Sequence, residues 1–234
     1  MISINIIATN KYLEFLPDLI ESIDRFFIKK DRVNVIIHTN LEIGNLSSDN
    51  GRISVTKNQI THEAWPFTTL KRFHYFLSVE EIIMKSDYSF YIDADSLFIG
   101  DIDTDILPRG GMIGTIHPCL FNSCGTPERN PESTAFIHPN EKNRYFCGGF
   151  FGGDSLSFMN MSKIISNNID IDLKNNIIAI WHDESHINRF FLDNTPSSIL
   201  EPPFAVAESL TEMREESKIL FLDKNLRGGH NNFR

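Results

Sequence analysis

A regular alternation of apolar runs and helical patterns over the first 92 residues constrains the fold more than any other feature. Nearly continuous apolar runs predict buried strands over residues 2–8, 33–38 and 88–92. Apolar side chains at helical spacing predict helices over residues 15–27 and 68–83. Strands and helices that alternate in this way are typical of an α/β fold with a mostly parallel central sheet.

Two weaker signals belong to the same half. Ile53 and Val55 indicate a short further strand. Thr68 or Thr69 has the side chain expected of a helix N-cap, so either could begin the helix over residues 68–83.

The second half of the chain is less regular. Strands are predicted over residues 112–117 and 218–222, and helices over about 154–166 and 184–192. Residues 118–146 lack clear periodicity, and a stretch this long inside a compact domain is more often functional than decorative. Because no linker or internal repeat divides the sequence, we expect residues 1–234 to form a single domain.

The composition excludes several classes of protein. The 22 basic and 31 acidic residues give a net charge of −9, the opposite sign to that of most nucleic-acid-binding proteins. No stretch approaches 18 consecutive apolar residues, and the first residues lack a basic leader, so we expect no transmembrane segment and a cytoplasmic location. Cys119, Cys124 and Cys147 are few and odd in number, which favours buried or idle thiols.

The strongest local motif is Asp93-Ala94-Asp95, directly after the apolar run over residues 88–92. Ligands of open α/β sheets bind at the carboxyl ends of strands, and two carboxylates at this spacing can share one divalent cation. An Asp-rich turn with a structural role is the simplest alternative. Phosphatases of the haloacid-dehalogenase type also place Asp-x-Asp after a strand, but theirs lies near the N-terminus, with a Thr or Val shortly after it.

A second carboxylate pair, Asp183 and Glu184, follows Trp181-His182 at the start of a predicted helix. Asp183 could be the N-cap of that helix, and Glu184 could interact with the helix dipole. The functional interpretation is that one carboxylate positions hydroxyl groups and the other stabilises positive charge that develops at an anomeric carbon.

Glycines and basic residues supply weaker signals. The segment of residues 148–153 contains Gly148-Gly149 and Gly152-Gly153, which permits close approach of a ligand but also suits turns and bulges. It matches neither a P-loop nor a dinucleotide fingerprint. Basic side chains that could neutralise a diphosphate, or lie in solvent, are Lys71, Arg72, Lys224 and Arg227.

Taken together and in order, these motifs resemble one known family. They are the segment of residues 65–72, Asp93-Ala94-Asp95, His117-Pro118, the glycines of residues 148–153, and Trp181-His182-Asp183-Glu184-Ser185. The sequence resembles the retaining α-1,3-galactosyl- and N-acetylgalactosaminyltransferases of the ABO blood-group type, glycosyltransferase family six, over most of the chain. The resemblance implies a GT-A fold, which is a nucleotide-binding α/β sandwich. It also implies transfer from a UDP-sugar to an oligosaccharide acceptor.

The resemblance also implies roles for individual residues. The donor site would include Ile7, Ala8, Thr9, Tyr12, Arg72, Asp93, Ala94, Asp95, Cys147, Gly148, Gly149, Asp183, Lys224 and Arg227. Asp93 and Asp95 would hold Mn²⁺, or Mg²⁺ in its place, against the diphosphate. Asp183 and Arg72 would act on the donor sugar, and Glu184 matches the proposed nucleophile or oxocarbenium stabiliser. The acceptor site would be formed by His117, Thr126, Trp181 and Glu184.

The chain departs from the family pattern in places. The transmembrane helix of the animal members is absent, which suggests a soluble bacterial or viral-type member, and Val206-Ala207 replaces an expected Trp-Asp pair. Many bacterial relatives carry Asn-x-Asn without metal, whereas this chain keeps both aspartates, which favours metal dependence. Cys147 and Gly149 match the positions that set donor choice, and their small size predicts UDP-N-acetylgalactosamine over UDP-galactose. A glycan-binding module without catalysis is the main alternative.

Overall fold

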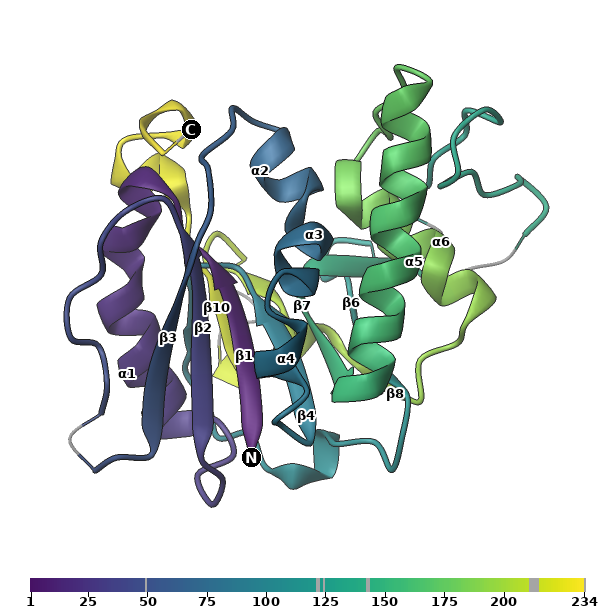
Figure 1. Ribbon diagram of the computed structural model, residues 1–234. Helices are drawn as coiled ribbons and strands as arrows, with labels where there is room; N and C mark the ends of the chain where they lie inside the picture. The colour runs from purple at the N-terminus through teal and green to yellow at the C-terminus, as the bar shows by residue number, and fades with distance from the viewer. Residues whose placement is uncertain (49, 121–122, 124, 142–143, 211–214, 234) are drawn as a thin grey trace.

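A seven-stranded sheet forms the centre of the protein, in the order β3-β2-β1-β4-β7-β6-β8 (Figure 1). The computed structural model describes residues 1–48, 50–120, 123, 125–141, 144–210 and 215–233. The strands of this sheet are β1 (Ile2–Ile7), β2 (Val33–Thr39), β3 (Ile53–Gln59), β4 (Tyr88–Ile92), β6 (Met112–Ile116), β7 (Phe146–Asp154) and β8 (Ser198–Leu200). Strand β7 runs antiparallel to β4 and β6, whereas the other neighbours are parallel. The expected α/β fold with a mostly parallel sheet is confirmed, and it is consistent with a GT-A type fold.

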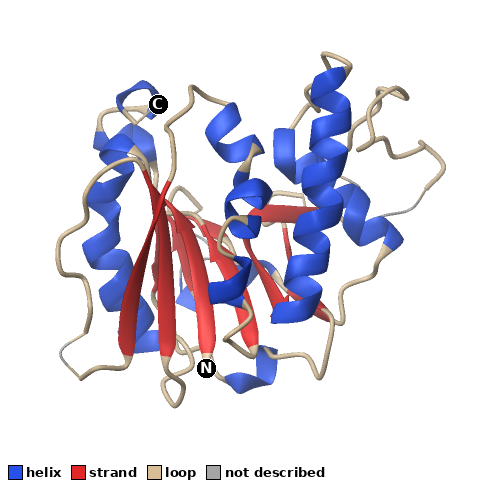
Figure 2. Ribbon diagram, in the orientation of Figure 1, coloured by secondary structure: helices blue, strands red, loops and turns tan. Residues whose placement is uncertain are grey.

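A smaller sheet and the helices complete the architecture (Figure 2). The smaller sheet has the order β5-β10-β9 and consists of β5 (Ser96–Phe98), β10 (Ile219–Phe221) and β9 (Val206–Ala207). The α-helices are α1 (Leu16–Phe26), α2 (Phe67–Leu70), α3 (Arg72–Leu77), α4 (Glu80–Ile83), α5 (Ser155–Lys174) and α6 (His182–Asp193). Short 3₁₀ segments are Asn10–Phe15, Thr104–Ile106, Pro202–Phe204, Lys224–Arg227 and His230–Asn232. Among the described residues, no helix has both the length and the apolar character needed to cross a membrane.

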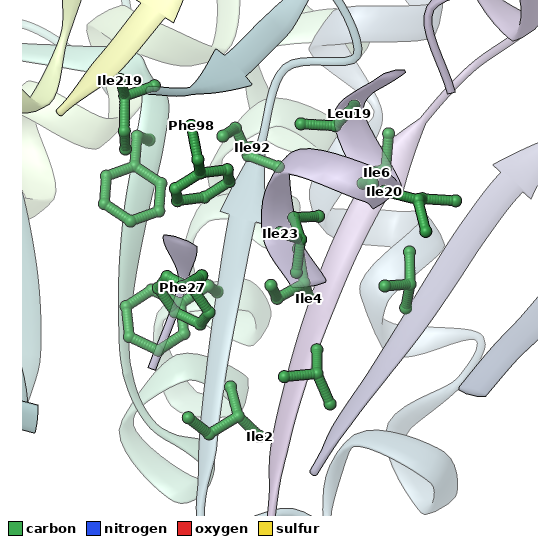
Figure 3. Packing of buried hydrophobic residues seen from close by; sticks show 14 of the residues in the cluster. Ile2, Ile4, Ile6, Leu19, Ile20, Ile23, Phe27, Ile92, Phe98 and Ile219 are labelled. Carbon is green, nitrogen blue, oxygen red and sulfur yellow. The ribbon is translucent and has the colours of Figure 1, made fainter. Parts of the chain in front are cut away.

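Two buried clusters cover the two faces of the central sheet. On one face, alternate residues of β1 pack against α1, as Figure 3 shows for Ile4, Ile6, Leu19 and Ile23. On the other face, residues of α3, α5 and α6 pack against β4, β6 and β7. Strand β4 is buried along nearly its whole length, as its unbroken apolar sequence predicts.

The sheet topology brings the chemically active segments to one edge. Parallel strands β1 and β4 end there, followed by Thr9 and by Asp93. Strand β7 runs the opposite way, so it begins at this edge, with Gly148 and Gly149 beside the end of β4. Helix α2 and the C-terminal segment lie at the same edge (Figure 1).

Several sequence predictions need correction. The single helix expected over residues 68–83 is three short helices, because Lys71 and Val79 have non-helical backbone angles. Neither Thr68 nor Thr69 is an N-cap, since the cap residue of α2 is Pro66, and the Thr68 hydroxyl donates to the Glu63 carbonyl.

The glycine segment and the later helices also differ from expectation. Residues 148–153 lie within the central strand β7, where a turn or loop was an alternative. Helix α5 continues to Lys174 rather than ending near residue 166, and β8 was not predicted. Helix α6 begins at His182, so Asp183 lies inside its first turn and is not its N-cap.

Candidate active site

A cavity of about 600 Å³ opens at the edge where β1 and β4 end and β7 begins. It brings together these residues predicted from the sequence: Ile7, Thr9, Tyr12, Arg72, Asp93, Ala94, Asp95, Trp181, Glu184 and Lys224. The cavity is also lined by residues that were not assigned to the donor, acceptor or metal site from the sequence: His62, Glu63, Trp65, Thr68, Thr69, Tyr91, His182, His230 and Phe233. The cavity therefore joins segments from both halves of the sequence, including the C-terminal segment.

Arg72 is the buried positive charge at the centre of this site. Its Nε atom lies 2.7 Å from Asp183 Oδ2, in an ion pair whose angles are not those of a hydrogen bond. Its Nη1 donates to the Gly148 carbonyl at 2.5 Å, and its guanidinium lies 4.2 Å from the centre of the Tyr91 ring. Burial opposes the charge of Arg72, but the nearby carboxylates, Asp183 above all, outweigh it and raise the pKa of Arg72.

Asp183 and Glu184 lie side by side in the first turn of α6 but have different partners. Glu184 Oε2 accepts the Gly148 N–H at 2.7 Å, and its Oε1 accepts the Tyr145 hydroxyl at 2.9 Å. Burial raises the pKa of Asp183 to about 7, opposed by Arg72, and burial also raises the pKa of Glu184. The residue before them, His182, has a φ of 50°, and strain of this kind in a non-glycine residue clusters at functional sites.

The Asp93-Ala94-Asp95 motif lies where β4 ends, as predicted. Asp93 is about one-third exposed (35%), and its Oδ1 accepts the Tyr91 hydroxyl at 2.7 Å. Asp95 is buried and pairs with Lys224 from the C-terminal segment. Burial and the neighbouring Asp93 raise the pKa of Asp95, although the charge of Lys224 opposes them.

The donor set of these two aspartates fits a hard divalent cation. Carboxylate oxygens suit Mn²⁺ and Mg²⁺, and two of them leave coordination positions for phosphate oxygens. Within the described residues, no cluster of three or more acidic, His or Cys side chains could hold a metal by itself. A cation at this site would therefore take the rest of its ligands from the substrate or from water.

A bulge at the start of β7 places Gly148 and Gly149 in the site. Gly114 of β6 pairs with Phe151, but Ile116 pairs with Phe146, so β7 carries extra residues at this point. The bulge directs the Gly148 N–H to Glu184 and its carbonyl to Arg72. Bulges of this kind are common beside active sites, where they redirect a strand.

Gly149 has less free space than the sequence suggested. A Cβ atom at this position would lie 2.5 Å from Cε1 of Phe221 and 3.1 Å from Oδ2 of Asp93. The space beside Gly149 is thus filled by the Phe221 ring, which corrects the expectation that an acetamido group could sit against this backbone. Cys147 is buried, as predicted, and burial raises the pKa of its thiol to about 12, which disfavours the thiolate form.

The predicted acceptor residues form a second group beside the cavity. The Trp181 indole N–H donates to the Thr126 hydroxyl at 2.5 Å, and Trp181 is half exposed. The His117 ring lies 5.9 Å from the ring of Tyr145, whose hydroxyl reaches Glu184. Thr126 and His117 do not line the cavity itself. Thr126 contacts Trp181, which does, and His117 is connected to the lining residue Glu184 through Tyr145.

The C-terminal segment lies along one side of the cavity and contributes Lys224, His230 and Phe233 to its lining. The Phe233 ring lies 5.5 Å from the Tyr12 ring, and Lys224 lies 5.8 Å from the centre of the Tyr12 ring. Arg227 differs from expectation, because it pairs with Glu208 at 2.6 Å and does not line the cavity.

Other predicted residues lie just outside the cavity or away from it. Ala8, Cys147, Gly148, Gly149 and Asp183 do not line it, although Gly148 and Asp183 contact residues that do. Val206, where the family pattern has an aromatic residue, is buried in β9 beside β10. Of the cysteines, Cys119 and Cys147 have free thiols, and Cys124 lies outside the described residues.

Comparison with known proteins identifies the family to which this chain belongs. The sequence profile of glycosyltransferase family 6 matches residues 1–226. The chain belongs to glycosyltransferase family 6. Because the profile covers both Asp93-Ala94-Asp95 and Trp181-His182-Asp183-Glu184-Ser185, the residues that meet in the cavity all lie within the matched family region, except His230 and Phe233.

Curated members of glycosyltransferase family 6 match the chain at modest identity. It is 28% identical over 248 residues to the O-antigen biosynthesis glycosyltransferase WbnI of Escherichia coli, a match that covers 100% of this chain and 99% of WbnI. It is 28% identical over 220 residues to histo-blood group ABO system transferase 1 of Rattus norvegicus, covering 89% of this chain and 62% of that protein. It is 31% identical over 210 residues to globoside alpha-1,3-N-acetylgalactosaminyltransferase 1 of Gallus gallus, covering 87% of this chain and 61% of that protein. The chain thus spans about three-fifths of these animal relatives and nearly all of WbnI.

Proposed function

We propose that this chain is a retaining α-1,3-glycosyltransferase that moves N-acetylgalactosamine or galactose from a UDP-sugar to an oligosaccharide acceptor. In this proposal, residues 1–234 form a single catalytic domain that works in the cytoplasm and requires Mn²⁺ or Mg²⁺. One observation carries the proposal: a single cavity holds an aspartate pair at the end of β4, a buried arginine, and a glutamate whose carboxylate is fixed by two hydrogen bonds. Family membership supports the same reaction.

The nucleotide half of the donor would bind at the ends of β1 and β4. Ile7, Thr9 and Tyr12 line this part of the cavity, and Ala8 supports them from the buried side. Asp93 and Asp95 would hold the cation, which neutralises the diphosphate and stabilises UDP as a leaving group. Lys224, now paired with Asp95, has the charge and position to contact the diphosphate.

The sugar half of the donor would lie between Arg72 and α6. Asp183 would accept hydrogen bonds from sugar hydroxyls while Arg72 balances its charge. As the bond between the anomeric carbon and the β-phosphate oxygen breaks, its electron pair leaves with UDP and positive charge develops on the sugar. The Glu184 carboxylate would stabilise that charge, because the Gly148 N–H and the Tyr145 hydroxyl hold it in place before the reaction.

The acceptor would approach from the side of Trp181. Exposed aromatic rings stack well on the apolar faces of sugars, and Trp181 is half exposed and oriented by Thr126. His117 lies behind this group, against Tyr145.

For the donor sugar, we propose N-acetylgalactosamine over galactose. The name of the globoside relative supports this choice, whereas the space beside Gly149 does not, because Phe221 fills it. A preference of about 10- to 100-fold is the range that a pocket of this kind supplies.

The product of the reaction tests the proposal. The enzyme is incubated with Mn²⁺, UDP-N-acetylgalactosamine or UDP-galactose, and a panel of oligosaccharides that end in galactose or N-acetylgalactosamine. We expect a product whose new linkage is α-1,3 by NMR. A β-linked product contradicts retention, and a glycan that binds without any release of UDP favours a binding module.

A further inference from the structure

Tyr91 is a buried residue of β4 whose side chain contacts two parts of the site at once. Its ring is 3% exposed and packs between Phe76 and Phe151, with ring centroids 5.6 and 5.4 Å away. This packing fixes the direction of the hydroxyl group, which donates to Asp93 Oδ1 at 2.7 Å. From its place in an apolar run, Tyr91 is expected only to be part of the strand.

The face of the same ring supports Arg72. The guanidinium carbon lies 4.2 Å from the ring centre, a distance at which a cation is attracted to an aromatic face. Arg72 Nη2 lies 4.0 Å from Asp93 Oδ1, which is the oxygen that accepts the Tyr91 hydroxyl. A hydrogen bond would need a separation of about 2.7–3.2 Å, so Arg72 and Asp93 are close but not in direct contact.

Direct contact between Arg72 and Asp93 would impair both residues. Arginine and carboxylate groups form strong, charge-assisted pairs when nothing separates them. If the Arg72 guanidinium bound Asp93, it would neutralise the carboxylate charge that a divalent cation needs. Arg72 would also move away from Asp183 and the Gly148 carbonyl. The Tyr91 hydroxyl opposes this contact, because its hydrogen bond holds Asp93 Oδ1 in its present position, 4.0 Å from Arg72 Nη2.

We propose that Tyr91 is a positioning residue that keeps Asp93 apart from Arg72, so that the carboxylate remains available to the divalent cation and the guanidinium to the donor sugar. This inference rests on the proposed function, because it assumes that Asp93 binds a cation together with UDP. Residues that orient a metal ligand by a hydrogen bond typically change metal affinity by about 10- to 100-fold when they are removed.

The test replaces Tyr91 by Phe, which keeps the ring beneath Arg72 and deletes the hydroxyl. Tyr88→Phe is the matched control, because Tyr88 lies on the same strand and its hydroxyl donates to the Pro108 carbonyl at 2.9 Å, away from the site. The readout is the affinity for Mn²⁺ in the presence of UDP, measured from free Mn²⁺ by electron paramagnetic resonance without any turnover. The melting temperature of each variant is also measured, and Mn²⁺ binding is determined below the lower of the two melting temperatures.

We expect Y91F to weaken Mn²⁺ binding by about 10-fold or more, while Y88F binds like the wild type. Each variant loses one hydrogen bond, so the two melting temperatures should fall alike, by about 2–4 °C. Wild-type Mn²⁺ affinity in Y91F overturns the inference and leaves the proposed function standing. A wild-type protein that binds no Mn²⁺ with UDP overturns both the metal dependence and this inference.

Discussion

Replacing Glu184 by Gln removes one negative charge from the site while the hydrogen bonds that fix the side chain can re-form. The Gly148 N–H can donate only, so the amide oxygen of Gln would take the place of Oε2. The Tyr145 hydroxyl can rotate and accept a hydrogen bond from the amide N–H group in place of donating one to Oε1. The variant therefore tests the charge of Glu184 with little change in its position.

The size of the effect follows from the burial of this charge. Two unit charges about 4 Å apart interact by about 4 kcal/mol at the effective dielectric constant of a protein site, and a partly developed charge interacts by about half as much or more. A loss of about 3–4 kcal/mol from the transition state lowers kcat by about 10²- to 10³-fold. Burial raises the pKa of Glu184, which means that its ionised form is disfavoured in the folded protein, so the neutral Gln should not lower the melting temperature.

The assay measures kcat from UDP release, the affinity for UDP by calorimetry, and the melting temperature. We expect kcat to fall while UDP affinity and stability remain close to wild type, because Glu184 acts only as the bond to UDP breaks. Glu81→Gln is the control, since Glu81 is an exposed residue in the first turn of α4 and tests the helix-dipole contribution alone. Equal kcat values for E184Q and the wild type would refute the reasoning and leave Glu184 as a helix-end charge.

Three further changes test other parts of the site. Asp95→Asn should lower Mn²⁺-dependent turnover by about 10²-fold or more, because it removes a charge that a hard cation requires; unchanged turnover at saturating Mn²⁺ would contradict this. Gly149→Ala should cost about 1–3 kcal/mol of stability, since its methyl group meets Phe221, and should leave the kcat/KM ratio of UDP-N-acetylgalactosamine to UDP-galactose close to wild type; a large shift toward UDP-galactose would contradict this by showing that the sugar reaches this position. Between about pH 9 and pH 5, kcat/KM should fall as the pH drops through about 7, where buried Asp183 gains a proton. The folded state holds that proton more tightly than the unfolded state does. The contribution of Asp183 to stability should therefore decrease as the pH rises from its ordinary pKa of 3.8 to about 7, which melting temperatures measured across this pH range will test.

Periodicity was sufficient to predict three parallel strands in the first half of the fold. The strands β1, β2 and β4 are apolar runs in the sequence, and the aspartates that follow β4 lie at the sheet edge where strand topology places them. The prediction failed where tertiary contacts override local pattern. The helix over residues 68–83 is broken at Lys71, a change of direction that places the next residue, Arg72, under the site with its side chain buried.

The site was predicted through motifs, and the misses have physical causes. The Phe221 ring occupies the space where a side chain at position 149 would lie. Phe221 is 72 positions away along the chain, and no local sequence pattern predicts such a contact. Asp183 resembles an N-cap in sequence, but its partner is Arg72 on another helix. His62, from a loop, and His230, from a short 3₁₀ segment, line the cavity and belong to no motif, so only the folded chain brings them to it.

The release of UDP from UDP-N-acetylgalactosamine, with Mn²⁺ and then with excess EDTA, tests the central claim most directly. The account predicts slow release to water and faster release with an oligosaccharide acceptor, both of which require the metal and disappear in EDTA. UDP release that persists unchanged in EDTA would contradict the metal role of Asp93 and Asp95. No UDP release under any condition, with phosphate release from an aryl phosphate in its place, would contradict the proposed reaction itself.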